Sequence, residues 1–486
     1  MKNRILLATV IIALSQIVSA QNIDDALRYS QTFYQGTARF NGMSGAFTAL
    51  GGDMSAIQLN PAGLGLFRST EISVTPQLFT NRVNTTFTGS ASDFTSKLGL
   101  SQIGIVSVLK TGSGAGLNNI SISYTYNRTN NLDLYGRIKG TLNNTSMAEY
   151  WAGISNGYNR NELGGDAYLA QYTYLTDTLS GYSNQWGTIF SSYGDASYQS
   201  GQSVERIIDN TGHQGEHTIA FGANIGDKIY IGAALGLDEI SYTGHYEHSE
   251  YLTSGNIYGF YNFNYVNHFD AEGNGANFKF GVILRPIESL RIGFSMQTPT
   301  VYNMDETFYS SISSSFDYGN FDAGTGTSTY SYKLRTPGRI NLGLAYQVGS
   351  LALLSADYEF VDYSTAKLRA GIDGYNFTSE NSDIKSELQN TGNLRLGAEL
   401  HMGSLYLRGG YRYYGSAFQS GTLNEDKHYS GYSLGFGYRQ NPFYIDFAFS
   451  GLVSKEQYMM YADSYLDPAS IKSNQNTFSA TVGFKF

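Results

Sequence analysis

The last ten residues of the chain, Thr477–Phe486, read TFSATVGFKF. Every second residue is apolar up to the final position: Phe478, Ala480, Val482, Phe484 and Phe486. Because successive side chains of a β-strand point to opposite faces, this spacing places all the apolar side chains on one face. The segment therefore predicts a strand with one apolar and one polar face that runs to the end of the chain.

The same alternation recurs in four other stretches: 278–284, 351–360, 393–400 and 405–413. On the polar face, neighbouring predicted strands carry charges of both signs: Asp357, Glu359, Arg395, Glu399, Arg408 and Arg412. Such charges can pair in the wet lumen of a barrel, while the apolar face, with Tyr near many strand ends, is typical of a lipid belt with aromatic girdles. A soluble β-sandwich also alternates, but these two features favour a transmembrane antiparallel β-barrel.

The composition agrees with a chain built from strands and turns. Of 486 residues, 40 are Tyr, 28 Phe and 56 Gly, against 7 Pro and 2 Trp. The absence of cysteine excludes disulfides, thiolate metal sites and a cysteine nucleophile. A formal net charge of -9 and the lack of a basic run argue against a nucleic-acid partner.

The N-terminus predicts export. Lys2 and Arg4 precede an apolar run, Ile5–Leu14, and Val18-Ser19-Ala20 supplies small residues for cleavage after Ala20. The apolar run is too short to span a bilayer, so we interpret residues 1–20 as a signal peptide. No later apolar run approaches about 18 residues, so a membrane location requires a barrel.

Short and long connections alternate along the predicted strands of residues 70–486. The short turns are 110–116, 225–228, 285–289, 347–350, 401–404 and 439–442, and the long polar links are about 82–100, 141–215, 247–257, 311–324, 368–390, 417–427 and 456–473. Barrels of the outer membrane have short periplasmic turns and longer external loops. These connections join 14 strands and predict both ends of the barrel on the periplasmic side.

The number of strands in this scheme stays open. The count of 14 treats 258–286 and 325–347 as single strands with kinks at Gly273–Gly275 and Thr336–Pro337, and splitting them gives 16. In the external insert 141–215, Thr145–Ile154 predicts a short helix, with Ser146 as its N-cap and Glu149 completing a capping box.

Residues 21–69 do not alternate and predict a compact string of turns. The apolar turn Ala46–Leu50 ends at two glycines, and Asp53 is the expected N-cap of Met54–Gln58. Asn60, held off helical geometry by Pro61, precedes a further turn that Pro61 can open. The segment is too short to form its own core, so we expect a plug in the periplasmic half of the barrel lumen.

This plug carries a family resemblance. The run GTARFNGMSGAFTALGGDMSAIQLNPAGLG (36–65) resembles the hatch of the FadL-type long-chain fatty acid transporter family, whose Asn-Pro-Ala motif matches Asn60-Pro61-Ala62. The stretches 279–295, 337–364 and 393–414 are similar to hairpins of its barrel. The terminal Phe486 matches the ending of the family and the signal read by the outer-membrane assembly machinery.

The resemblance implies a 14-strand outer-membrane barrel with an N-terminal hatch. It implies a monomer, surrounded by outer-membrane lipid and lipopolysaccharide, that takes up hydrophobic small molecules such as long-chain fatty acids without energy coupling. The ligand binds among apolar side chains, the hatch rearranges, and the ligand leaves sideways into the bilayer through a gap in the wall. A kink near Gly136–Gly140 on the third strand is the expected position of that gap.

Site residues follow from the hatch. We expect gating residues at Asp53, Asn60, Pro61 and Ala62, and ligand contacts at Phe40, Met43, Phe47, Met54 and Ile57. Each also has a structural reading: a helix cap for Asp53, a tight turn for Asn60-Pro61, and packing of the plug for the five apolar residues.

Three other functions stay open. Some relatives are labelled as haemin receptors, which suggests haem binding by His245 and His248 as an alternative. Residues three apart on a strand, however, face opposite sides. The insert 141–215 alternatively serves as an adhesive surface, and a plain porin is disfavoured because a plug blocks the lumen. No Ser-His-Asp arrangement, phosphate loop or metal-ligand cluster stands out, so we expect neither an enzyme nor a cofactor.

Overall fold

The computed structural model describes residues 23–111, 116–142, 145–190, 201–253, 257–371 and 374–486, so the predicted signal peptide lies outside the described residues. The described part of the chain begins with four short helices that precede the barrel: α2 (Ile23–Ser30), α3 (Ala38–Gly42), η2 (Met54–Gln58) and η3 (Pro61–Leu66). Among the described residues no helix is both long and apolar enough to cross a membrane.

The strands close into an antiparallel barrel of 14 wall strands, because β21 pairs with β1 along almost its whole length. Ten wall strands are single elements: β1 (Glu71–Thr86), β2 (Ser90–Lys110), β7 (Gln202–Ile225), β8 (Ile229–Leu252), β9 (Phe260–Ile287), β17 (Asn390–Met402), β18 (Leu405–Tyr414), β19 (Tyr429–Gln440), β20 (Phe443–Tyr458) and β21 (Ala469–Lys485). The predicted count of 14 is confirmed.

The other four wall strands are each interrupted and consist of two elements. They are β3 (Leu117–Asn131) with β4 (Leu134–Leu142), β10 (Leu290–Gln297) with β11 (Val301–Phe316), β13 (Ser328–Arg335) with β14 (Arg339–Val348), and β15 (Ala352–Asp362) with β16 (Lys367–Ala370). The break at Thr336–Gly338 lies where the sequence predicts a kink. At Gly273–Gly275, the other predicted kink, strand β9 continues without a break. The two glycines there make room for the side chains of Met304 and Tyr302.

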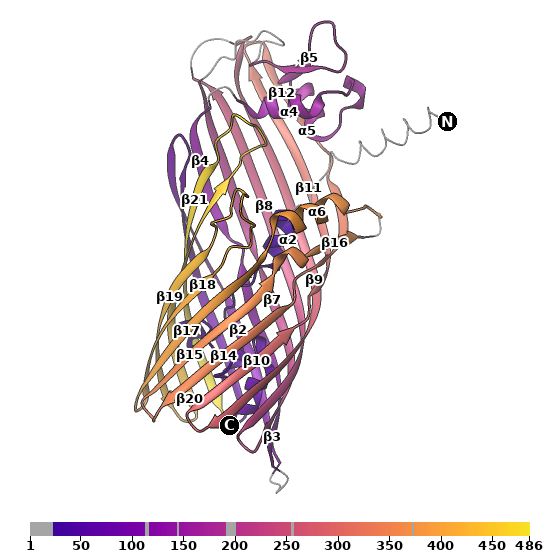
Figure 1. Cartoon of the computed structure of the whole chain (residues 1–486). Helices are drawn as coiled ribbons and strands as arrows, with labels where there is room; N and C mark the ends of the chain where they lie inside the picture. The colour runs from indigo at the N-terminus through magenta and orange to yellow at the C-terminus, as the bar shows by residue number, and fades with distance from the viewer. Residues whose placement is uncertain (1–22, 112–115, 143–144, 191–200, 254–256, 372–373) are drawn as a thin grey trace, which may run out of the picture.

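Apolar and polar residues alternate along the strands because, as predicted, successive side chains point out of the barrel and into it. On β14, Ile340, Leu342, Leu344 and Tyr346 point outward and are exposed, whereas Arg339 and Asn341 are buried inside the barrel. The exposed apolar side chains form a belt near the end of the barrel that carries the short turns. We call this end the short-turn end and the opposite one the long-loop end; the C-terminus lies at the short-turn end (Figure 1).

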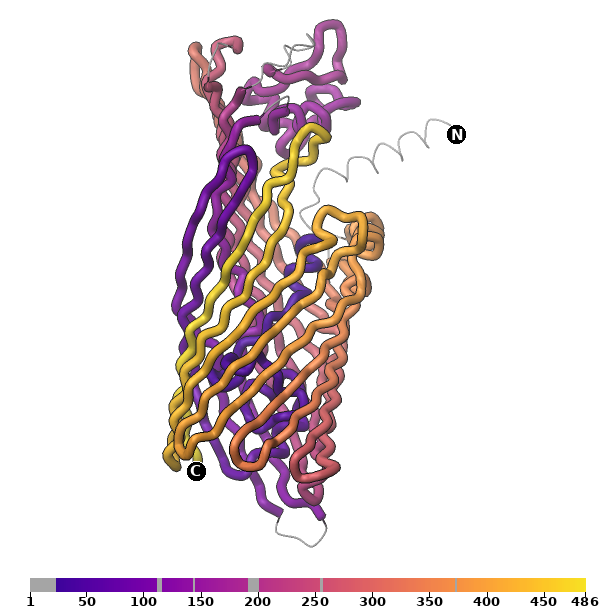
Figure 2. The backbone as a smooth tube through the Cα atoms, turned by 60° about the vertical axis from the view of Figure 1, so that its left-hand side comes forward, coloured from indigo at the N-terminus to yellow at the C-terminus, as the bar shows by residue number. Residues whose placement is uncertain are grey.

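The wall does not reach the same height all round. In Figure 2 the hairpins β1–β2 and β20–β21 rise well above the orange wall strands β15–β19. The expected long link at about 82–100 is therefore wrong: β1 and β2 pair from Glu71 with Val106 to Thr86 with Ser90. Beyond the apolar belt most residues on both faces of this hairpin are polar, with Val83, Phe94 and Leu98 as exceptions, so the period-two pattern is weak in the sequence although the strands continue.

The insert between β4 and β7 lies across part of the long-loop end (Figure 1). It contains α4 (Met147–Ser155), η4 (Arg160–Glu162), α5 (Gly165–Tyr172), β5 (Thr176–Thr178) and β6 (Trp186–Thr188), and it ends at Gln202, earlier than the predicted residue 215. The helix predicted at Thr145–Ile154 forms with Ser146 as its N-cap, but the Glu149 carboxylate accepts a hydrogen bond from Thr188. Apolar side chains of α4 and α5 pack with wall residues such as Phe263 and Ile312 in one cluster, so the insert covers the lumen.

The remaining elements lie at the rim of the long-loop end. They are β12 (Gly319–Gly324), which pairs with β11, the single turn η6 (Tyr363–Thr365) and α6 (Thr378–Glu387). Helix α6 packs against α2, whose Leu27 and Ala26 share an apolar cluster with Ile384 and Leu388.

The plug, residues 31–67, fills the short-turn half of the lumen, and α2 rises from it toward mid-height (Figure 1). Inward-facing glycines of the wall let its backbone approach closely. A Cβ atom at Gly232 would lie 2.3 Å from the carbonyl carbon of Pro61, and one at Gly293 would lie 2.3 Å from the carbonyl oxygen of Thr48. Glycine is therefore required at these wall positions as long as the plug is in place.

Candidate functional site

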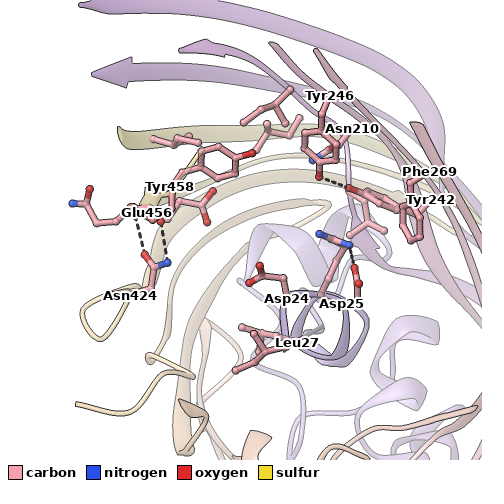
Figure 3. Close-up of a pocket in the computed structure, with 18 of the residues that line it drawn as sticks. Asp24, Asp25, Leu27, Asn210, Tyr242, Tyr246, Phe269, Asn424, Glu456 and Tyr458 are labelled. Carbon is pink, nitrogen blue, oxygen red and sulfur yellow. Dashed lines mark hydrogen bonds and ion pairs between the residues drawn. The ribbon is translucent and has the colours of Figure 1, made fainter. Parts of the chain in front are cut away.

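A cavity of about 810 Å³ lies above the plug, between α2 and the insert. Asp24, Asp25 and Leu27 of α2 form part of its floor (Figure 3). Its walls include Asn210, Tyr242, Tyr246, Phe269, Glu456 and Tyr458, and Tyr150 and Ile154 of α4 border it from the insert. This volume is large enough for a drug-sized or lipid-like molecule.

The cavity lining is half aromatic or aliphatic and half polar. Two ion pairs neutralise charges in it: Arg28 with Asp25, and Lys427 with Glu456. Arg206 of β7 is 7% exposed and donates through Nη2 to the Tyr458 hydroxyl at 3.4 Å. Within the described residues its Nε and Nη1 groups have no hydrogen-bond partner. Arg206 lines the cavity, and its positive charge favours a ligand that carries an acceptor or anionic group.

The cavity also borders an interruption in the barrel wall, which we call the seam. Backbone pairing of β2 with β3 stops at Gln102 and Asn127, and β4 pairs with β7. Residues Asn130–Leu134, where β3 gives way to β4, line the cavity. The upper part of β2 is thus paired with β1, and its outer side carries Leu98, which is 84% exposed.

Side chains bridge the seam where the backbone ladder is absent. Arg137 donates to the Asp93 carboxylate through Nε at 2.8 Å and through its backbone N–H at 3.0 Å. Lys97 lies 2.9 Å from Asp133, and Thr88 accepts a hydrogen bond from the backbone of Thr141 at 2.6 Å. These bonds are local and can break without unzipping a β-ladder.

Strand β4 lies on the lumen side of the β1–β2 hairpin. A Cβ at Gly136 would lie 2.8 Å from Val83, whose side chain points inward, and one at Gly140 would lie 2.0 Å from Thr88 Oγ1. The expected kink at Gly136–Gly140 is therefore displaced: the chain turns at Leu132–Asp133, and the two glycines permit close packing of β4 behind the hairpin.

The plug contacts both sides of the seam. The backbone N–H groups of Phe33 and Gln35 donate to the carbonyls of Thr129 and Arg128 on β3, at 2.8 and 3.1 Å. On the β2 side, the Ser101 hydroxyl donates to the Gly36 carbonyl at 2.8 Å. The plug thus occupies the β3 edge that β2 leaves unpaired.

The Asn60-Pro61-Ala62 turn joins the plug to the opposite wall. The Asn60 Oδ1 atom accepts from the Ala62 N–H at 3.0 Å and so caps η3, with Pro61 as its first residue. The Asn60 Nδ2 group donates to the Thr48 carbonyl at 2.7 Å and lies 3.3 Å from the Phe294 carbonyl on β10. One amide therefore links two plug segments and a wall strand, while Ala62 is fully buried.

The five apolar residues expected to contact ligand lie elsewhere. Phe40, Met43, Phe47, Met54 and Ile57 are buried in plug clusters and do not line the 810 Å³ cavity. Sequence reasoning missed the cavity residues, which come from α2, the upper wall strands and the insert. A signal did exist at the seam, because Asn130-Asn131-Leu132-Asp133 is a run of turn-forming residues inside a strand.

Asp53 caps η2 by accepting a hydrogen bond from the Ser55 N–H at 2.9 Å, and it also accepts from the Thr37 hydroxyl. Burial raises the pKa of Asp53 above its ordinary value, although Arg39 and these hydrogen bonds oppose the shift. A raised folded-state pKa means that the folded plug binds the proton more tightly than the unfolded chain. Asp53 therefore contributes less stability as the pH rises through that pKa.

We expect Asp53→Asn to stabilise the plug at pH 7, because the amide keeps an acceptor for Ser55 and removes a buried charge. The gain should vanish as the pH falls toward about 4, the ordinary aspartate value. Asp53→Ala should instead cost about 1 kcal/mol through loss of the cap. Limited proteolysis of the plug between pH 4 and 8 measures both effects, and a pH-independent gain for Asp53→Asn would contradict the assignment.

The histidines do not form one site. His248 is fully buried inside the barrel and hydrogen-bonds Glu250 at 3.0 Å, whereas His245 faces outward beside His268. His213 and His217 lie on the outer side of β7, each within 4 Å of Glu239. Across the ranges that the structure covers, no group of three or more metal-ligating side chains could hold a metal ion.

The fold and the cavity define a plugged transmembrane β-barrel, and comparisons with known proteins identify its family. The model of the outer membrane protein transport protein family (OMPP1/FadL/TodX) matches residues 182–486, so the chain belongs to this family and is an outer-membrane protein. The predicted resemblance to FadL-type transporters is confirmed. No curated protein matches the sequence significantly.

Solved structures share the architecture at low sequence identity. A FadL homologue of Pseudomonas aeruginosa superposes with a TM-score of 0.55 and 13% identity, over 94% of this chain and 100% of that chain. The toluene transporter TodX of Pseudomonas putida gives 0.52 and 13%, over 93% and 98%. The monoaromatic hydrocarbon channel CymD gives 0.50 and 11%, over 93% and 97%.

Proposed function

We propose that this protein is a passive channel that takes up hydrophobic small molecules across the outer membrane. A ligand enters at the long-loop end, is held in the 810 Å³ cavity, and leaves sideways into the bilayer through the seam. An apolar ligand gains about 0.8 kcal/mol for each buried methylene, so the cavity can compete with water. The protein would move the ligand without changing it chemically.

The observation that carries this proposal is the contact of one plug segment with both the cavity and the seam. Phe33 lines the cavity, and the backbone of Phe33–Gly36 bonds to both strands that flank the seam. A shift of this segment on ligand binding would free the β3 edge and leave the side-chain bridges as the remaining barrier. Asp53, Asn60, Pro61 and Ala62 would guide that shift, because they fix the turns of the plug.

The lining favours an amphiphile such as a long-chain fatty acid over a pure hydrocarbon. The positive charge of Arg206 in the lining suits a carboxylate, and Ile208, Tyr246 and Phe308 offer apolar surface for a chain. Haem has less support, because His245 and His248 face opposite sides of β8.

Orientation and partners follow the same proposal. The short-turn end would face the periplasm, with both ends of the barrel there, and the exposed Phe486 would be read by the assembly machinery. The tall polar extension of the wall would stand among lipopolysaccharide sugars, around a single-chain barrel. The adhesion alternative gains little from the insert, since much of its apolar surface is buried against the wall.

Locking the seam should abolish uptake. The chain has no native cysteine, so Asp93→Cys/Arg137→Cys can be linked across the seam with a cleavable bis-maleimide. We expect uptake of radiolabelled oleate to fall about tenfold or more after linking and to return on cleavage, because the lateral exit would be the only route. The control pair Ser313→Cys/Asp322→Cys links β11 to β12, away from the seam.

Normal uptake by the linked barrel would refute lateral exit while leaving a channel function possible. Equal loss in the control pair would show a non-specific effect of the linker. Failure of the unlinked variant to bind oleate would instead count against the substrate class.

A further inference from the structure

Exposed aromatic side chains gather at the long-loop end, on α5 and on the β11–β12 hairpin. Tyr168, Tyr172, Tyr174 and Tyr318 are 42%, 53%, 49% and 60% exposed. Tyr168 and Tyr172 lie 5.9 Å apart between ring centroids, and Phe321 lies 4.6 Å from Tyr174 and 5.9 Å from Tyr318. We call these five residues the tyrosine platform; its elements α5 and β12 lie together at the top of Figure 1.

The platform is held rigidly on the barrel. Asp166, near the start of α5, accepts hydrogen bonds from Tyr265 of β9 at 2.8 Å and from Ser310 of β11 at 2.5 Å. At the other end of α5, the Thr173 carbonyl accepts from Ser314 at 2.7 Å. A surface fixed in this way loses little conformational entropy when it binds a partner.

The backbone of Tyr174 is strained. Its φ angle is +59°, a left-handed conformation that bulky residues adopt rarely. Such a conformation is unfavourable and persists only where the surroundings enforce it. Here it holds an aromatic ring half-exposed against Phe321, where packing alone would favour burial.

The chemistry of the platform indicates a sugar-binding surface. Its exposed rings are tyrosines, whose apolar faces suit the C–H faces of a pyranose and whose hydroxyls form hydrogen bonds. Asp317, Asn320 and Asp322 are exposed on the same hairpin and supply acceptors for sugar hydroxyls. Because two of these three groups are carboxylates, they would repel a phosphorylated or sulfated chain.

We propose that the tyrosine platform binds a neutral saccharide. From the exposed Val301 of the apolar belt to Phe316, β11 is roughly 50 Å long at about 3.3 Å per residue. At the tilt of about 40° that is usual for barrel strands this is a rise of roughly 38 Å, which places the platform outside the bilayer core. None of the five platform residues lines the cavity. Saccharide binding is therefore a separate activity and does not depend on the transport proposal.

Affinity electrophoresis of the full-length protein in detergent tests this proposal, with immobilised maltohexaose, cellohexaose or mannohexaose as neutral probes and dextran sulfate as the anionic one. We expect retardation by at least one neutral probe and none by dextran sulfate. Tyr168→Ala/Tyr172→Ala and Tyr318→Ala should each weaken binding about tenfold, the loss expected for a stacking ring. Tyr432→Ala, an equally exposed position on β19, is the matched control.

Migration of unheated samples checks that each variant is folded, and oleate uptake should be unchanged. Tyr318→Phe should keep most of the binding, because it preserves the ring. No retardation by any neutral probe, equal retardation of the platform variants, or preference for dextran sulfate would each overturn the proposal.

Discussion

A Gly281→Val barrel should conduct ions, whereas the native barrel should be closed. Gly281 of β9 faces the plug, and a Cβ atom there would lie 1.8 Å from Asn60 Oδ1 and 3.2 Å from Pro61. Valine cannot fit without displacing the Asn60-Pro61 turn, and a fourteen-strand barrel without its plug approaches the size of porins. Single-channel recording in planar bilayers should show a roughly tenfold rise in conductance.

Two further variants make this expectation specific. Gly409→Val on β18 is the control, since a Cβ there meets only the Ser433 carbonyl oxygen at 3.9 Å. Gly281→Ala also places a Cβ atom against Asn60 Oδ1 and should open the barrel. Adding Asn60→Ala to it removes the clashing oxygen and should lower the conductance again. A Gly281→Val barrel that folds and stays closed would contradict the close contact between plug and wall.

The barrel could be predicted because lipid and lumen impose opposite demands on alternate residues. On β21, Phe478 and Val482 face outward and Ser479 and Thr481 face inward, as the alternation in TFSATVGFKF requires. The rule fails above the belt, where water bathes the outer face. There β1 and β2 continue through Asn84 and Ser92, residues that on their own suggest a loop.

Local signals also located the turns of the plug. Asp53 caps η2 as expected, because capping depends on residues two or three positions away. Asn60, expected only to be extended before the turn that Pro61 opens, is extended and also caps η3. The apolar segment Ala46–Leu50 ends in a turn before Gly51 and Gly52, as expected. Its partner is distant: the Thr48 N–H donates to Asp357 on β15 at 2.8 Å.

The cavity and the seam could not be predicted, since their parts meet only in the closed barrel. The cavity joins α2 to Tyr458 of β20, more than four hundred residues away in sequence. The seam depends on a β2–β3 ladder that ends early, and a ladder is a property of two strands. Single-strand patterns reveal neither, although the turn residues around Asp133 mark the break.

Glu399→Ala should cost the protein about 3–5 kcal/mol, because it leaves the buried Arg39 without its carboxylate partner and removes one of the two carboxylates that pair with Arg408. The Glu399 carboxylate accepts from Arg39 of the plug at 2.9 Å through both Nε and Nη2, and from Arg408 Nε of β18 at 2.6 Å. After the change Arg408 keeps Asp446, whereas Arg39 keeps the Gly52 carbonyl and the face of the Phe47 ring but no carboxylate hydrogen bond among the described residues. We therefore expect the plug to detach before the wall unfolds.

Urea titration of the barrel in lipid vesicles, followed by protease digestion of the plug, separates these two events. The exposed pair Arg160–Asp177 supplies the control, since Asp177→Ala should change stability by less than about 1 kcal/mol. The double variant Arg39→Ala/Glu399→Ala should recover part of the loss, because it removes one of the unpaired charges along with its partner. If Glu399→Ala lowered the stability of the wall but left the plug protected from protease, Arg39 would not be what holds the plug to β17.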